Sequence, residues 1–274
     1  MMSIAEYLQY GFIQRAIAAG AFISLLCSTL GVLLVLRRLS LIGDGLAHVT
    51  FGSVALGLLF GTYPVYVSLP VVMASSVGIL KLMERARIFG DAAIGILSAL
   101  GIAGGVMIAS IAGGFNIDLF SYLFGNILSI SVEEVYTSVI LSLIVLVVIV
   151  FNYHDIFSIT FDEEFAKAGG INTQKLNTMI VLFTSITVVL TMKVVGIMLT
   201  SALLIFPAVT AFQIAGSFKY SLMAAGAVSL ASVMLGIMLS LFFNLPTGAT
   251  IVLANAFFLT TAFIFKRVRS RGRT

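Results

Sequence analysis

Asp44 and His48 are the residues of this sequence whose types and spacing best suit chemistry. They lie four residues apart in an apolar segment. On an α-helix that spacing places both side chains on one face, about 6 Å apart along the axis. A carboxylate and an imidazole together form a ligand pair suited to Zn²⁺, Mn²⁺ or Fe²⁺. Ionisable groups inside a membrane are costly and usually mark a substrate path, so we interpret this pair as lining the path of a cation.

Each of the two residues, taken alone, also has a structural explanation. Asp44 could cap the N-terminus of its helix, and His48 could donate a hydrogen bond to a backbone carbonyl. The sequence has no Lys or Arg close enough to neutralise Asp44, which favours the cation path. One Asp and one His are too few for a complete site, so a homodimer that brings two such pairs to its axis would supply four ligands. The other histidine, His154, lies beside Asp155 in a polar loop, and we assign it no role in the path.

The elements that must position this pair are membrane helices. The 274 residues are 60% hydrophobic and 9% charged, with a mean hydropathy of +1.17. Soluble domains are roughly 45–50% apolar and about 25% charged. A bilayer core requires about 20 apolar residues per helix, and nine runs approach that length. They cover residues 16–36, 44–61, 64–82, 92–112, 132–152, 178–193, 194–214, 219–243 and 247–265. We therefore expect an all-α integral membrane protein with about nine transmembrane helices, within a range of eight to ten, in one domain over residues 1–274.

Basic residues orient these spans. They cluster at Arg37 and Arg38, in residues 81–87 and in residues 266–273, and nine alternating spans place all three clusters on one side. The positive-inside rule makes that side cytoplasmic, with the N-terminus outside and the C-terminus inside. The net charge of +4 then reflects basic cytoplasmic loops, and we expect membrane lipid and no nucleic acid as a partner.

Four further features shape the helices. Residues 113–131 are apolar but too short to cross the membrane twice, and we expect a re-entrant or interfacial helix there. The longest polar loop, residues 153–177, contains an expected amphipathic helix at about 162–170, with acidic residues at its start and Gly169 and Gly170 at its end. Pro207 should kink or interrupt its helix. Glycines such as Gly52 and Gly101 predict close helix packing.

The sequence contains no nucleotide-binding signature. The motif Gly-x-x-x-x-Gly-Lys-Ser/Thr does not occur, and no Ser/His/Asp arrangement can be defended as catalytic. We therefore expect a transport protein and not an enzyme. If ATP drives the transport, a separate chain must bind it, and the acidic helix at 162–170 is then a natural docking element for that chain.

Three segments resemble the membrane permeases of ABC importers for zinc, manganese and iron. Residues 36–48, which include Gly-Asp-Gly-Leu-Ala-His, look like the signature of that family, and residues 193–208 resemble its later marked helix. Residues 162–170 are similar to the family's coupling helix, which sits in a cleft of the ATPase subunit. The resemblance assigns ATPase coupling to Asp162, Glu163, Glu164, Phe165, Ala166, Ala168 and Gly169. Length and hydropathy match over essentially the whole chain.

This resemblance implies a type II ABC importer permease in the cytoplasmic membrane of a prokaryote. Its expected partners are a second copy of itself, two copies of an ATPase, and an extracellular metal-binding lipoprotein or other solute-binding protein. Asp44 and His48 are the metal-path residues that carry over, and the metal is transported cargo, with no permanently bound cofactor. The Gly-Asp-x-Leu-Ala-His form looks closer to the zinc members. The alternatives are a manganese or iron permease, or an ATP-independent secondary cation transporter that uses the pair as a proton or ion relay.

Overall fold

Helices make up the fold of the computed structural model, which describes residues 10–86, 88–114, 117–126 and 130–271; these ranges contain no strand. Nine helices in these ranges are long and apolar enough to cross a membrane. They are α2 (Gly11–Leu36), α3 (Ile42–Leu59), α4 (Pro64–Arg85), α5 (Gly90–Ile111), α7 (Val132–Phe151), α10 (Thr173–Thr191), α11 (Thr200–Ile214) with the preceding turn η2 (Ile197–Leu199), α12 (Phe218–Phe243) and α13 (Thr247–Arg271). The predicted all-α fold with nine membrane helices is confirmed.

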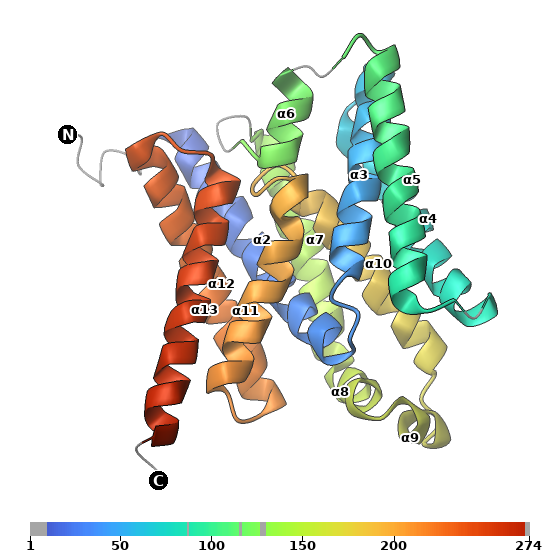
Figure 1. Cartoon of the computed structure of the whole chain (residues 1–274), viewed down its shortest axis with the longest axis vertical. Helices are drawn as coiled ribbons and strands as arrows, with labels where there is room; N and C mark the ends of the chain where they lie inside the picture. Colours follow the sequence, from blue (N-terminus) through green and yellow to red (C-terminus); the bar gives the residue numbers. More distant parts are fainter. Residues whose placement is uncertain (1–9, 87, 115–116, 127–129, 272–274) are drawn as a thin grey trace.

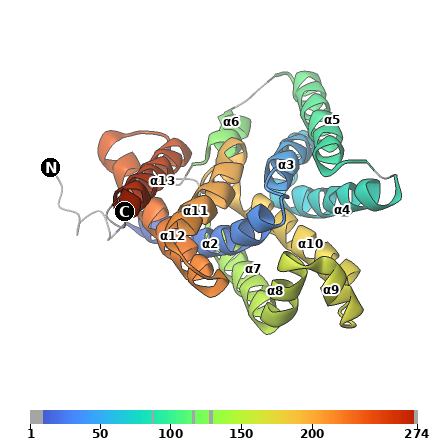
Figure 2. The same ribbon diagram turned by 60° about the horizontal axis from the view of Figure 1, so that its bottom comes forward.

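The nine long helices of the described residues form one bundle. Helix α2 begins in the upper left of Figure 1, whereas α13 ends at the bottom, as an odd number of spans requires. Helix α2 packs against α7, α11 and α12, while α3 packs against α4 and α5 on one side of the bundle and α12 against α13 on the other (Figure 2). Most of α2 and α3 is buried, whereas α5 and α7 leave most of their apolar side chains exposed. Exposed apolar faces of this kind suit contact with lipid or with another membrane helix.

Helices α3 and α5 pack so closely that their backbones are in contact. A Cβ atom added at Gly52 of α3 would lie 2.7 Å from the carbonyl oxygen of Gly101, and one added at Gly101 would lie 2.7 Å from the carbonyl oxygen of His48. A Cβ at Gly105 would lie 2.5 Å from the ring of Phe51. The close packing expected at these glycines is therefore present, but Gly104 has open space around it, with no atom within 4 Å of an added Cβ.

Two shorter segments behave as non-spanning elements. Within the segment 113–131 the structure has α6 (Ile117–Phe124), whose eight residues reach only about 12 Å and cannot cross a bilayer. Residues 115–116 and 127–129 of that segment lie outside the described residues. In the polar loop, α9 (Glu163–Ala168) falls within the range expected for the amphipathic helix.

A second helix, α8 (Tyr153–Phe161), occupies the first part of the same loop, where we expected none. Its aromatic residues Tyr153, Phe157 and Phe161 recur every four positions and gather around Phe218, at the start of α12, with ring centroids 5.3–6.0 Å from that ring. This aromatic stripe gives α8 an apolar face that packs on the bundle, and the spacing of four was the signal that we overlooked.

Two other sequence predictions concern Pro207 and the basic clusters. Helix α11 continues through Pro207, so the proline does not interrupt it, and the kink stays a prediction. The irregular backbone lies earlier, where Gly196 adopts a φ of 95° just before η2. Arg87 and residues 272–273 of the basic clusters lie outside the described residues.

Substitutions at two glycines of α5 test the α3–α5 contact. We expect Gly101→Ala to lower the melting temperature of the detergent-purified protein, because its methyl group would press on the backbone of α3 at a cost of about 1–3 kcal/mol. The matched control is Gly104→Ala, three residues away on the same helix, where the methyl group meets nothing. It should leave the melting temperature unchanged or raise it slightly. Equal melting temperatures for the two variants would contradict this packing.

Candidate functional site

Asp44 and His48 occupy the first two turns of α3, with their side chains on the same face. The His48 Nε2 atom lies 3.6 Å from Asp44 Oδ2. The imidazole is 21% exposed and the carboxylate 48% exposed. Helix α3 therefore presents a carboxylate and an imidazole together, and the carboxylate remains open to groups from outside this chain.

The structure shows neither the N-cap role considered for Asp44 nor a hydrogen bond from His48 Nδ1 to a described backbone carbonyl. The N-cap of α3 is Leu41, so Asp44 lies in the first helical turn and does not act as the N-cap. A carboxylate in that position interacts favourably with the helix dipole. His48 Nδ1 is buried, and no group in the described ranges forms a hydrogen bond with it. Among the described residues, His48 Nδ1 is therefore left without a hydrogen-bond partner, and the Asp44 carboxylate is left half exposed.

One chain does not complete a metal site with this pair. No group of three or more His, Cys, Asp and Glu side chains in the described part of the sequence could hold a metal ion. Protein zinc sites generally have four ligands, and the pair provides two residues. Among the described His, Cys, Asp and Glu residues, this pair therefore lacks the further ligands that a complete zinc site needs.

The seven residues expected to couple to an ATPase all lie on or beside α9. Asp162 caps this helix by accepting a hydrogen bond from the backbone N–H of Phe165 at 2.9 Å. The helix ends at Gly169, and Gly170 takes a φ of 86°, a conformation that favours glycine. Ala166 is buried, whereas the other six are exposed: Asp162, Glu163, Glu164, Phe165, Ala168 and Gly169. Phe165 is 74% exposed.

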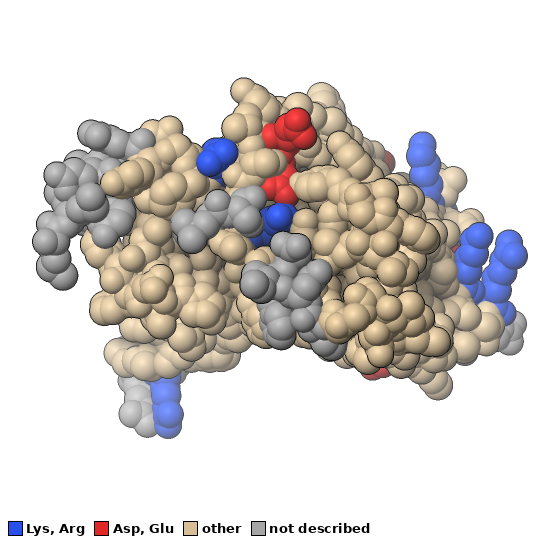
Figure 3. Space-filling view, turned by 90° about the horizontal axis from the view of Figure 1, so that it is seen from above, with Lys and Arg blue, Asp and Glu red and all other residues tan. Residues whose placement is uncertain are grey.

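A second polar cluster, which sequence reasoning missed, lies at the opposite end of the bundle. Lys193 Nζ is 3.4 Å from Glu134 Oε1 and 4.4 Å from the centre of the Tyr122 ring, and the Tyr63 hydroxyl donates to Glu134. Glu134 is also part of a capping box with Ser131 at the start of α7. Figure 3 looks onto this end and shows acidic and basic side chains side by side near the middle of a face that is otherwise mostly uncharged. The four residues come from separate stretches of the chain: Tyr63 precedes α4, Tyr122 lies on α6, Glu134 on α7, and Lys193 in the turn after α10. Only the Ser-x-x-Glu capping box is visible locally in the sequence.

We call Tyr63, Tyr122, Glu134 and Lys193 the outer cluster. Contacts among these side chains connect the segments that carry them. Both charged side chains are largely buried, with 15% of Lys193 and 9% of Glu134 exposed. Burial raises the pKa of the Tyr63 phenol, and the Glu134 carboxylate raises it further, so the phenol remains a hydrogen-bond donor. Because the two charges neutralise each other, we assign this cluster a role in holding the outer ends of the helices and not in binding a cation.

Comparisons with known proteins agree with this architecture over nearly the whole chain. The profile of the ABC 3 transport family matches residues 9–266. The chain is 34% identical to the "Probable iron transport system membrane protein" of Haemophilus influenzae, over 98% of both chains. It is 29% identical to the manganese transport system membrane protein MntC of Listeria innocua, over 97% of this chain and 94% of the relative.

A zinc relative and a solved structure complete the comparison. The chain is 34% identical to the high-affinity zinc uptake system membrane protein ZnuB of Buchnera aphidicola, over 87% of this chain and 92% of the relative. It also resembles the structure of PsaBC from Streptococcus pneumoniae in complex with Fab, with a TM-score of 0.82, 28% identity and 95% of both chains covered.

The fold and these matches define a multi-pass membrane protein of the kind that forms the permease subunit of ABC transporters. The chain belongs to the ABC 3 transport family. Its curated relatives carry names for the transport of iron, manganese and zinc, which supports metal transport as the shared activity.

The outer cluster can be tested by removing one charge at a time. Glu134→Gln leaves the Lys193 ammonium buried without its partner, and we expect a loss of about 3 kcal/mol in the free energy of unfolding. The double variant Glu134→Gln with Lys193→Met removes both charges and should recover most of that loss. Thermal unfolding of the detergent-purified protein measures both effects.

The neighbouring exposed carboxylate provides the control, because Glu133→Gln makes the same chemical change one residue away and should be neutral. If Glu134→Gln were as stable as Glu133→Gln, the buried pair would not be holding these helix ends.

Proposed function

We propose that this chain is the permease subunit of an ATP-binding cassette importer for a divalent transition metal, with zinc as the first candidate. The observation that carries the proposal is the Asp44–His48 pair on one face of α3, in a member of the ABC 3 transport family. Family membership favours an ATP-driven importer over the ATP-independent secondary transporter that the sequence left open. The membrane would be the cytoplasmic membrane of a prokaryote, with α2 starting outside and α13 ending inside.

A second copy of the chain would complete the metal path. A two-fold axis beside α3 would bring two Asp44 carboxylates and two His48 imidazoles together, because a two-fold interface repeats the same surface from both copies. The two carboxylates would offset the charge of a divalent cation, and the four side chains would supply the usual ligand number of zinc. The Asp44 carboxylate, which is 48% exposed in the single chain, supports this arrangement.

ATP hydrolysis would come from a separate chain docked on α9. The exposed Phe165 side chain offers the apolar anchor that such an interface needs, and three acidic residues precede it in the chain. Arg37, Arg38 and Lys266 would lie on the same cytoplasmic side, as the positive-inside rule requires. Two copies of the permease would bind two copies of the ATPase, and an extracellular metal-binding protein would deliver the cargo to the opposite face.

In the proposed transport cycle, the path residues bind the ion transiently. The metal enters from the binding protein, is held between the two Asp44–His48 pairs, and leaves towards the cytoplasm when ATP hydrolysis moves the helices apart. Weak, shared ligation suits this role, because an ion must be able to leave a site that it crosses. The Gly-Asp-x-Leu-Ala-His form supports zinc, and the names of the relatives, which include iron, manganese and zinc, keep iron and manganese as alternatives.

Substitution of the path residues tests the proposal directly. We expect Asp44→Asn and His48→Ala each to reduce metal uptake into cells at least about 100-fold, because removing one ligand from each copy removes half of the site. Membrane insertion and protein amount should not change. Elemental analysis of the same cells identifies the cargo as the metal whose content falls.

Two matched controls separate the path from general effects. Asp91→Asn changes an exposed carboxylate in the first turn of α5, and His154→Ala changes the histidine of α8; both should transport normally. Wild-type uptake in Asp44→Asn and His48→Ala would sink the proposed metal path.

A further inference from the structure

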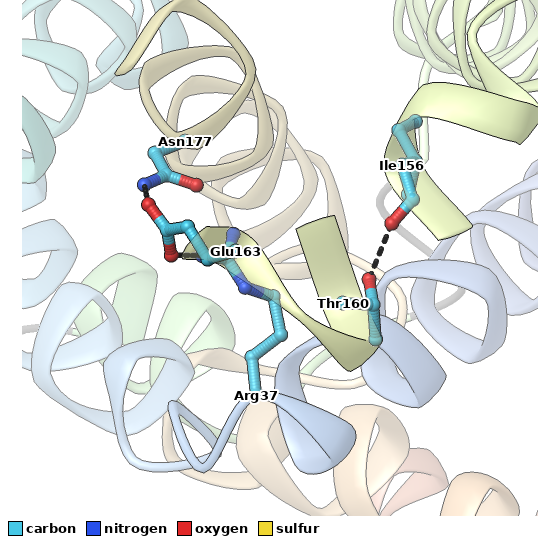
Figure 4. Close-up of polar contacts among 5 residues, drawn as sticks. All are labelled: Arg37, Ile156, Thr160, Glu163 and Asn177. Carbon is cyan, nitrogen blue, oxygen red and sulfur yellow. Dashed lines mark hydrogen bonds and ion pairs between the residues drawn. The ribbon is translucent and has the colours of Figure 1, made fainter. Parts of the chain in front are cut away.

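Glu163 of α9 is held between two other elements of the chain. Its Oε2 atom lies 2.9 Å from Arg37 Nη2, and its Oε1 atom accepts a hydrogen bond of 2.8 Å from Asn177 Nδ2 (Figure 4). Arg37 is the C-cap of α2, and Asn177 lies on α10. One carboxylate therefore joins the short helix α9 to two helices of the bundle, and each of its oxygens has its own partner.

The ion pair is more than a surface contact. The Arg37 side chain is only 9% exposed, whereas Glu163 is 45% exposed. Burial lowers the pKa of the Arg37 guanidinium, and the Glu163 charge opposes that shift. A guanidinium in such a place requires an opposite charge nearby. Glu163 supplies it, so displacement of α9 would leave the Arg37 charge unpaired unless Arg37 moved too.

A short, hydrogen-bonded turn connects Arg37 to the path residue Asp44. The turn doubles back at Arg38, which takes a left-handed φ of 58°, and the backbone N–H of Leu39 donates to the carbonyl of Leu34 at 2.8 Å. Helix α3 starts three residues later, at Ile42. Because the turn is fixed at both ends by helix and by backbone hydrogen bonds, it would transmit a displacement of Arg37 to α3 instead of absorbing it.

We propose that Arg37 is a positioning residue that links the ATPase-coupling helix to the metal path through the Arg37–Glu163 ion pair and the α2–α3 turn. This inference rests on the proposed function, in which α9 contacts the ATPase and α3 lines the path. It adds the physical connection between the two. Movement of α9 during ATP hydrolysis pulls on Arg37, and the turn passes this movement to the start of α3 and therefore to Asp44. Asn177 anchors the other side of the Glu163 carboxylate on α10.

A transport assay that counts metal ions per ATP separates this role from a structural one. The complex of the chain with its ATPase is reconstituted in liposomes, and Zn²⁺ and Mn²⁺ uptake are each measured beside ATP hydrolysis. We expect Arg37→Gln to retain ATP hydrolysis within about twofold, while the metal transported per ATP falls about tenfold. Arg38→Gln is the matched control, because it removes the same charge from the adjacent, exposed residue, and it should keep the wild-type ratio.

A conservative variant provides a rescue. Arg37→Lys keeps a positive charge opposite the Glu163 carboxylate without altering α9, and it should hold the ratio of metal to ATP within about threefold of the wild type. A wild-type ratio in Arg37→Gln would overturn the inference. So would a proportional loss of hydrolysis and uptake, because that result assigns Arg37 to assembly alone.

Hydrogen exchange tests the same link without any metal. In the wild-type complex, nucleotide binding should change the exchange of backbone amides in residues 38–48, and this change should disappear in Arg37→Gln but remain in Arg38→Gln. A response that persists in Arg37→Gln overturns the inference and leaves the proposed function intact. Normal metal uptake in Asp44→Asn, in contrast, refutes the proposed path and leaves the link from α9 to α3 standing. A chain that forms no complex with an ATPase overturns both.

Discussion

The close approach of α3 and α5 is the constraint on which the candidate site depends. In lipid, apolar side chains gain little by leaving the solvent, so helices associate through close packing of small residues. Gly52, Gly101 and Gly105 allow the two backbones to touch, and Gly101 lies directly against the carbonyl of His48. This contact fixes the position of the helical turns of α3 that carry the candidate site. It therefore determines where Asp44 and His48 stand, while Asp44 remains half exposed towards whatever completes the site.

The depth at which polar and charged side chains lie in this bundle follows the cost of burying them in a membrane. The described ion pairs between oppositely charged side chains lie near the ends of helices, where Arg37 meets Glu163 and Lys193 meets Glu134. Deeper in the bundle, hydroxyl groups such as that of Thr50 donate to carbonyls of their own helix. Asp44 differs from both patterns, because its ion-pair partner in the described part of the chain is a histidine, which need not be charged. A carboxylate left in this state is suited to a cation, and this property connects the fold to transport.

Local patterns predicted most of the fold, whereas contacts between distant residues escaped prediction. Hydropathy identified nine spans because each span is apolar over its own length, and the i, i+4 spacing of Asp44 and His48 is equally local. The aromatic spacing of four in α8 is a local signal too, but the Phe218 ring on which this stripe packs is distant in sequence. The pairing of Lys193 with Glu134 joins elements far apart in sequence, and no spacing rule reveals such a pair. The number of ligands led to the hypothesis of a site shared by two copies, but one sequence contains no signal for where the axis between them lies, so the shared site stays a prediction.

The central claim is that two copies of the chain share one metal site made from their Asp44–His48 pairs. X-ray absorption spectroscopy of the purified permease–ATPase complex loaded with Zn²⁺, combined with elemental analysis, tests it most directly. The account predicts one ion for every two permease chains, with imidazole nitrogen ligands at about 2.0–2.1 Å, and loss of that ion in His48→Ala. One ion bound to each chain, or a site that survives His48→Ala with its nitrogen ligands intact, would contradict it.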